Sequence, residues 1–277
     1  MTGSRIAAIV ATLAFLATAA PAEETVRVSG TGAAIGGMKL LGNAFGKRHP
    51  GVKVVVFPSL GSTGGIKAVA AGKLDLAVAA RPVKEDERVP GLVENPYAKT
   101  PFVFATSSSN PAGGLRLSEI EDIYAGRRTT WPGGETVFLV LRPPSDAFTL
   151  FLESISPGMK DAVKASKERR GMFVGITDQE AADQIERSPG SLGVTSYSLV
   201  SSEKRNVKLL AVDGVSPVGK HGANEEYPYF MNLYLVYLKD RTAAPVDGFI
   251  EFIGSKEGRR ILRTSGNIPT GNGQARP

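Results

Sequence analysis

The sequence predicts an α/β protein made of two units, each with a parallel sheet covered by helices. From Thr25 onward, short apolar runs with strand periodicity alternate with segments of helical periodicity, and the pattern restarts near Phe102. Segments rich in Gly, Pro, Ser and Asn, at Ser107–Gly114 and Gly214–Asn224, are typical of crossings between units. With 277 residues, the chain is long enough for two domains, and two crossings imply that the C-terminal part completes the first unit.

The first unit is expected to run strand, helix, strand, helix, strand. Strands are predicted at Thr25–Ser29, Lys53–Phe57 and Leu74–Ala80, where β-branched and apolar residues gather. A helix that ends near Arg48 and a shorter one around Ile66–Ala70 separate these strands. This order is typical of a parallel sheet with helices on its faces.

The second unit alternates in the same way, and the C-terminal part follows it. Strands are predicted at Phe102–Thr106, Thr136–Leu141, Leu192–Thr195, Val207–Val212 and Tyr229–Tyr237. Helices are predicted at Thr149–Ile155, Met159–Lys167, Val246–Ile253 and Gly258–Thr264. Two capping boxes place further helices, Ser118 with Glu121 for one that ends near Gly126 and Thr177 with Glu180 for one that ends near Arg187. The Gly-rich residues 271–277 are expected to form a frayed tail.

An export signal is expected at residues 1–22. Arg5 supplies a positive charge, Ile6–Thr18 is an apolar run too short to span a membrane, and Ala20-Pro21-Ala22 is a cleavage motif of small residues. The alternative, a buried N-terminal helix, is disfavoured because the run has no polar face. We expect cleavage after Ala22 and release into a bacterial periplasm, since the chain has no cysteine for a lipid anchor.

The composition excludes several classes of function. Because the chain has no cysteine and only two histidines, His49 and His221, disulfide frameworks, thiol catalysis and histidine-rich metal sites are excluded. The formal net charge of +6 is dispersed, which favours a small anionic ligand over nucleic acid. Neither a dinucleotide fingerprint, a P-loop nor a Gly-x-Ser-x-Gly elbow is present, so we expect no cofactor and no enzymatic activity. An exported hydrolase is the weakest alternative.

Three turns follow strands and precede helices: Ser29–Ala34, Ser59–Gly65 and Arg142–Asp146. Helix N-termini attract anions through unpaired N–H groups and the helix dipole, and the carboxyl ends of parallel strands are where ligands bind in open α/β sheets. Arg81 and Arg142 also follow strands, and each is either an oxyanion ligand or a partner in a surface salt bridge.

Asp146 has two compatible interpretations. It could cap the N-terminus of the helix that follows, and its carboxylate could accept a hydrogen bond from a protonated anion. The second role would select hydrogen phosphate over sulfate, because sulfate carries no proton at neutral pH.

Several motifs together resemble periplasmic phosphate-binding proteins of ABC transporters. They are Val28–Gly32, Gly61–Lys67, Leu74–Pro82, Leu117–Gly126 to Trp131, Thr177–Ala181, Pro189–Gly193 and the closing segment Phe252–Pro269. The resemblance covers nearly all of the chain that follows the export signal. It implies a two-lobed, type II periplasmic-binding-protein-like fold with the ligand in a cleft between the lobes, and closure of the lobes like a hinge. We expect lobe 1 at residues 23–106 and 215–277 and lobe 2 at residues 107–214.

The resemblance also implies which residues contact the ligand. By position they are Thr31, Ala34, Ile35, Ser62, Thr63, Arg81, Arg142, Ser145, Asp146 and Ala147. The chain departs from the family because Ala34 replaces a threonine, Arg81 stands where some members have an aspartate, and Pro144–Ala147 replaces a Ser-Gly-Thr turn. The ligand is therefore expected to be phosphate, another tetrahedral oxyanion or a small organic anion.

The partner that the resemblance implies is an inner-membrane ABC permease. A periplasmic sensing subunit for a membrane receptor kinase is the alternative. We expect a monomer in either case, because the protein would diffuse freely between its ligand and its membrane partner.

Overall fold

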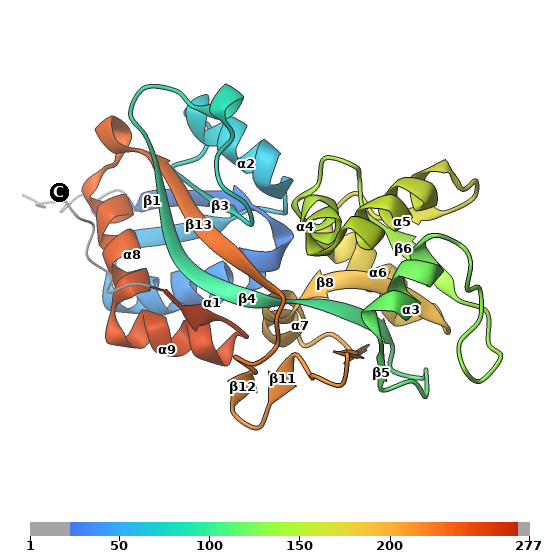
Figure 1. The fold of residues 1–277 in the computed structure, drawn as a ribbon. Coiled ribbons are helices and arrows are strands. Elements are labelled where there is room, and N and C mark those ends of the chain that lie inside the picture. Colours follow the sequence, from blue (N-terminus) through green and yellow to red (C-terminus); the bar gives the residue numbers. More distant parts are fainter. Residues whose placement is uncertain (1–22, 271–277) are drawn as a thin grey trace, which may run out of the picture.

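The computed structural model describes residues 23–270, in which strands and helices alternate to build two lobes (Figure 1). The first lobe contains β1 (Glu24–Gly30), α1 (Gly32–Arg48), β2 (Val52–Val56), α2 (Gly61–Ala70), β3 (Leu76–Ala79), β13 (Phe230–Leu238), α8 (Ala244–Gly254), α9 (Lys256–Thr264) and β14 (Ile268–Pro269). The second lobe contains β5 (Gly114–Leu115), α3 (Leu117–Tyr124), β6 (Phe138–Leu141), α4 (Ala147–Ile155), α5 (Pro157–Glu168), β7 (Phe173–Val174), α6 (Asp178–Arg187), β8 (Ser191–Ser196), β9 (Val207–Leu209) and β10 (Ala211–Val212). Near the junction lie β4 (Leu92–Ser107), α7 (Tyr197–Glu203), β11 (Val218–Gly219) and β12 (Gly222–Ala223). The predicted export signal and C-terminal tail lie outside the described residues.

One hydrogen-bonded sheet runs through both lobes, in the order β2-β1-β3-β13-β4-β8-β6-β7. Strand β1 pairs in parallel with β2 and β3, as predicted for the first unit, and β6 pairs in parallel with β8 and β7 in the second. Strand β4 links the lobes, because it pairs with β13 as far as Pro101 and with β8 from Phe102 onward. The lobe bounds expected from the sequence, at residues 106/107 and 214/215, remain a prediction.

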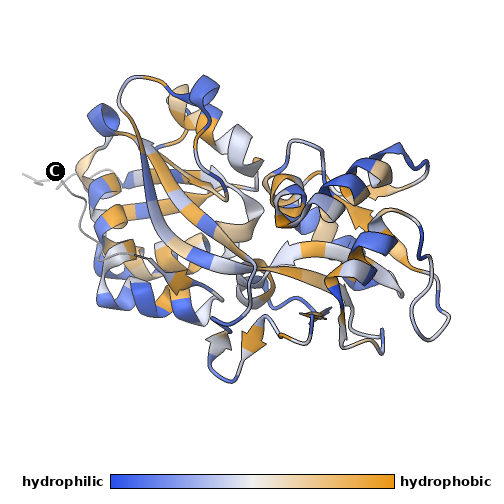
Figure 2. Ribbon diagram, viewed as in Figure 1, coloured by the Kyte–Doolittle hydropathy of each residue, from blue (hydrophilic) through white to orange (hydrophobic). Residues whose placement is uncertain are grey.

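Helices cover both faces of the sheet in each lobe. In β3, Leu76 and Val78 pack on the side of α1, whereas Ala77 and Ala79 pack on the side of α2. This alternation buries both faces of the strand, as expected for a parallel sheet between helices. In the second lobe α6 packs on one face of β6 and β8, and α4 and α5 lie over the other. Figure 2 shows hydrophobic residues concentrated on β6 and β13 and hydrophilic residues on α9.

The structure corrects three sequence-based predictions. Helix α3 begins two residues earlier than the predicted capping box of Ser118 and Glu121 would place it. Its N-cap is Arg116, whose amide donates to the Glu119 carboxylate at 2.9 Å. Strand β4 extends far beyond Phe102–Thr106, because one of its two prolines falls beside a bulge in β4 and the other where β4 changes partner. Helix α7 was not predicted, since its short, serine-rich sequence has no helical apolar stripe.

One predicted helix cap is confirmed. Thr177 caps α6 by accepting from the Glu180 amide at 3.1 Å, as its capping motif predicts. No helix within residues 23–270 combines the length and apolar character that a membrane span requires.

Candidate functional site

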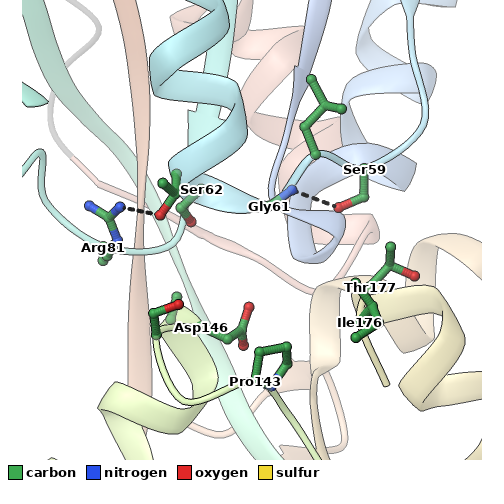
Figure 3. Close-up of a pocket in the computed structure, with 12 residues that line it drawn as sticks. Ser59, Gly61, Ser62, Arg81, Pro143, Asp146, Ile176 and Thr177 are labelled. Carbon is green, nitrogen blue, oxygen red and sulfur yellow. Dashed lines mark hydrogen bonds between the residues drawn. The ribbon is translucent and has the colours of Figure 1, made fainter. Parts of the chain in front are cut away.

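A cleft of about 230 Å³ lies between the start of α2 in the first lobe and the start of α4 in the second (Figure 3). Its walls come from both lobes, and the strand-to-helix turns at 59–63 and 143–147 face each other across it. The residues that line it are Ser59, Leu60, Gly61, Ser62, Thr63, Arg81, Pro143, Ser145, Asp146, Ala147, Ile176 and Thr177. Two of the three predicted turns therefore meet in one cavity.

The first-lobe wall is fixed to the end of β1. The Ser59 hydroxyl donates to the Gly30 carbonyl at 3.0 Å, and the Leu60 amide donates to the same oxygen at 3.0 Å. Gly61 then adopts φ +68°, a left-handed conformation that favours glycine, and α2 begins there. The Gly61 amide donates to the Ser59 hydroxyl at 3.3 Å (Figure 3). Within the described chain the N-cap residue of α2 makes no side-chain capping bond, so the amides that follow Gly61 are available to an anion in the cleft.

Arg81 closes one side of this wall and is held by several acceptors. Its Nη2 donates to the Thr63 hydroxyl at 2.7 Å, and its guanidinium forms a bidentate pair with Glu87 at 2.6 and 2.7 Å. The Arg81 side chain is 9% exposed, and its Nε finds no acceptor among the described residues. A buried N–H without an acceptor is costly, so a ligand oxygen that accepts from Nε would be stabilising.

The second-lobe wall is the N-terminus of α4. Asp146 is its N-cap, accepting from the Phe148 amide at 3.0 Å, and Ser145 and Ala147 flank it in the cleft. Asp146 also accepts from Arg142, at 3.3 Å from Nε and 3.0 Å from Nη2. The N-cap role predicted for Asp146 is thus present, and the carboxylate still faces the cavity (Figure 3).

The third predicted turn, at the start of α1, does not line this cleft. The Thr31 hydroxyl and the Ala33 amide both donate to the Asp178 carboxylate, at 3.2 and 3.1 Å. Ala34 and Ile35 are buried in α1, and the Ala34 amide donates to the Thr31 carbonyl at 3.1 Å. Their role as ligand contacts remains a prediction.

Asp178 is the residue that the sequence analysis missed as part of this region. Its Oδ1 accepts from Arg142 Nη2 at 3.0 Å, and its side chain is only 4% exposed. Burial raises the pKa of Asp178; Arg142 opposes this rise and the nearby charge of Asp146 adds to it. The capping motif placed Asp178 in the first turn of α6, but no local pattern shows that this turn packs against the start of α1.

The predicted contacts therefore fall into two groups. Ser62, Thr63, Arg81, Ser145, Asp146 and Ala147 come together in the cleft, whereas Thr31, Ala34, Ile35 and Arg142 lie behind it. Within residues 23–270, no group of three or more histidine, aspartate or glutamate side chains could hold a metal ion. The cleft offers amides, hydroxyls and a guanidinium, which is the chemistry that binds a small oxyanion.

Comparison with known proteins shows where this architecture belongs. The family model of the PBP superfamily domain matches residues 17–257, which is most of the chain. The chain belongs to the PBP superfamily. This membership confirms the two-lobed PBP-like fold expected from the sequence, and a PBP superfamily protein of this kind is a solute-binding protein and not an enzyme.

Two curated proteins resemble this PBP superfamily member in sequence. Protein SphX of Synechococcus elongatus is 25% identical over 95% of this chain and 83% of its own length. Phosphate-binding protein PstS of Bacillus subtilis is 24% identical over 76% of this chain and 69% of its own length.

A solved structure shares the fold. It is that of a candidate phosphate ABC transporter substrate-binding protein from Clostridium perfringens with bound phosphate, with a TM-score of 0.76 and 24% identity. The match covers 90% of this chain and 100% of that one. At this identity the likeness supports the fold, and the ligand must be argued from the cleft.

Proposed function

We propose that this protein is a periplasmic solute-binding protein that captures phosphate, or a related oxyanion, for an ABC transporter by closure of its two lobes. The observation that carries the proposal is the cleft, where the N-termini of α2 and α4 face each other and the buried Arg81 Nε lacks an acceptor. Two opposed helix N-termini would stabilise an anion from both lobes at once, which couples binding to closure. The names of PstS and of the Clostridium protein, a phosphate-binding protein and a protein with bound phosphate, agree with this ligand.

Export and the partner complete the proposal. We infer cleavage after Ala22, a monomer in the periplasm and delivery to an inner-membrane permease. Mass spectrometry of the exported protein tests the cleavage site, and light scattering with and without phosphate tests the monomer. A sensor kinase would be the partner instead if the phosphate-bound protein binds a kinase ectodomain and not the permease.

Calorimetric titration of refolded residues 23–277 tests the ligand, since refolding removes any anion that survives purification. Phosphate, arsenate, sulfate and a panel of carboxylates are compared. The test variant is Arg81→Gln with Glu87→Gln, which removes the donor without leaving a lone buried carboxylate. Arg88→Gln with Glu94→Gln is its matched control, because this neighbouring pair, 3.1 Å apart, does not line the cleft.

We expect phosphate to bind the wild type and the control, and to bind the test variant about ten-fold more weakly or worse, since a hydrogen bond to a charged group contributes about 1.5–3 kcal/mol. Equal phosphate binding by both variants would contradict the site. Absence of oxyanion binding by the wild type would contradict the function.

A small organic anion is the second candidate ligand, and two apolar residues on the rim favour it. Leu60 is 51% exposed and Ile176 is 67% exposed, and they reach the cleft from opposite lobes. An apolar substituent on the anion would bury both side chains. Binding of a carboxylate or an alkylphosphonate, without inorganic phosphate, would establish this candidate.

A further inference from the structure

One buried carboxylate joins the two lobes behind the cleft. Asp178 accepts from Thr31 Oγ1 and the Ala33 amide in the first lobe, at 3.2 and 3.1 Å, and from Arg142 Nη2 in the second, at 3.0 Å. The N-terminus of α1 and a buried arginine are the groups that an oxyanion would otherwise seek. The Asp178 carboxylate thus occupies, as part of the protein, a site that could otherwise bind a free anion.

Arg142 is shared between two carboxylates. Besides Asp178 it donates to Asp146, which lines the cleft, and its Nη1 donates to the Gly175 carbonyl at 2.6 Å. The side chains of Arg142 and Asp178 are 2% and 4% exposed, so solvent screens their charges little. One guanidinium facing two carboxylates leaves an excess negative charge on the second-lobe side of the cleft.

The remaining neighbours of Asp178 do not cancel this charge. On α1 it meets the Thr31 hydroxyl and the Ala33 amide, which are neutral. The next residue, Gln179, donates to the Gly32 carbonyl at 3.3 Å and to Glu203 of α7 at 2.8 Å. Glu203 is paired with Arg205 at 2.7 Å, and Arg205 also pairs with Asp183, so this contact adds no net positive charge. On the first-lobe side of the cleft, Arg81 is likewise paired with Glu87.

We propose that Asp178 is a specificity-determining residue, an internal anion that is bound to Arg142 and the start of α1 behind the cleft and disfavours anions without a proton. The inference rests on the proposed function. An anion such as sulfate can only accept hydrogen bonds. It is therefore repelled by the excess negative charge and donates no hydrogen bond that would offset this repulsion. Hydrogen phosphate can donate its proton to the cleft-facing Asp146 and is disfavoured less.

Asp178→Asn tests the proposal, because it removes the charge and keeps the shape and one acceptor oxygen. Asp183→Asn is the matched control: it removes the same charge from the same helix, where Asp183 pairs with Arg205 and is 38% exposed. Calorimetry with sulfate and phosphate at one pH gives both affinities for each protein.

We expect Asp178→Asn to bind sulfate about ten-fold more tightly than the control does, which corresponds to about 1.4 kcal/mol, and to gain less for phosphate. The ratio of phosphate to sulfate affinity should fall in this variant alone. An unchanged ratio, or weaker binding of both anions by a variant with wild-type circular dichroism, overturns the inference and spares the proposed function. If the wild type and Asp178→Asn bind no oxyanion at all, the proposed function and the inference fall together.

If Asp178→Asn does not fold, the pH dependence of sulfate affinity in the wild type tests the proposal instead. Sulfate remains a dianion from about pH 8 to about pH 5, so a change in its affinity across this range reports on protein groups. Because burial raises the pKa of Asp178, its protonation should begin at a higher pH than that of an exposed aspartate, and sulfate should bind more tightly as the pH falls. Asp146→Asn should keep this rise. A flat profile in the wild type, or one abolished by Asp146→Asn, overturns the inference.

Discussion

Arg81 and Glu87 form a buried bidentate ion pair beside the cleft, with Nη2 2.6 Å from Oε1 and Nη1 2.7 Å from Oε2. Glu87 also accepts from the Lys84 amide at 3.0 Å, so the short 3₁₀ turn at 85–87 holds the carboxylate against the guanidinium. The pair neutralises Arg81 and orients it. We infer that Arg81 serves an anion as a fixed donor rather than as a free cation.

The first prediction concerns this pair. Glu87→Gln should destabilise the protein by about 2 kcal/mol at neutral pH, because it leaves a buried guanidinium without its charge partner. Burial favours the neutral acid, but hydrogen bonds from Arg81 and the Lys84 amide outweigh it and lower the pKa of Glu87. A lowered pKa means stability that is present at neutral pH and lost as the pH falls through the folded-state pKa.

Urea unfolding of Glu87→Gln and wild type at neutral and acid pH checks this prediction. The difference in unfolding free energy should be large at neutral pH and shrink in acid. Glu85→Gln is the control, since Glu85 lies in the same turn and is 96% exposed. A difference that grows in acid would contradict the assigned charge state.

Much of the first lobe could be predicted because its signals are local. The strands near Thr25, Lys53 and Leu74 and the helices between them follow from periodicity, and their parallel pairing follows from the alternation itself. The turn at 59–65 could be placed in a ligand site for the same reason. Parallel strands end at one edge of the sheet, so their turns converge wherever the strands pair.

The features that escaped prediction depend on partners distant in the sequence. Strand β4 contains two prolines, which argue against a strand unless the strand itself bulges or changes its partner beside them. Asp178 lies 147 positions from Thr31, and only the packing of α6 against α1 brings them together. The start of α1 was predicted as a ligand contact because an empty helix N-terminus attracts anions, whereas here an internal carboxylate occupies it.

The second prediction concerns Asp146. Asp146→Asn should keep α4 capped, because asparagine is as good an N-cap as aspartate. Arg142 loses one ion pair but keeps the one with Asp178, so the melting temperature should change little. Loss of the carboxylate acceptor should weaken hydrogen phosphate binding about ten-fold and relax the rejection of sulfate. Calorimetry with both anions checks this, with Asp122→Asn as a control that is remote from the cleft and pairs with Arg127. Unchanged phosphate affinity in Asp146→Asn would show that Asp146 caps α4 and does not accept a hydrogen bond from the ligand.

The third prediction concerns acid stability in the second lobe. The Arg116 amide and the Arg128 side chain donate to Glu119, which outweighs burial and lowers the pKa of Glu119 from 4.5 to about 2. Glu119→Gln should cost about 1 kcal/mol or less at neutral pH, since the carboxylate is partly exposed. The loss should vanish as the pH falls from 4.5 to about 2, because the wild-type carboxylate then takes up a proton. Urea midpoints measured across this range check it, with the exposed Glu251→Gln as the control.

The last prediction concerns Gly30, which positions the cleft wall from the end of β1. Its φ is +139°, and a Cβ there would lie 1.9 Å from the Val78 carbonyl oxygen, a backbone atom that cannot move aside. Gly30→Ala should therefore destabilise the protein by about 3 kcal/mol or more. Gly133→Ala is the matched control, since its Cβ would meet nothing within 4 Å, and it should change stability by less than about 0.5 kcal/mol.

Gly30→Ala should also lower the affinity for the ligand. The Gly30 carbonyl accepts from Ser59 and Leu60, so a shift of this peptide would move the turn that begins α2 and weaken anion binding. Urea unfolding and phosphate titration of Gly30→Ala and Gly133→Ala measure both effects. Wild-type stability in Gly30→Ala would disprove the close approach of β1 to β3 at this point. If Gly30→Ala loses stability but keeps its phosphate affinity, the amides of the turn at 59–63 are still in position to bind the ligand. The turn would then keep its place without the hydrogen bonds to the Gly30 carbonyl.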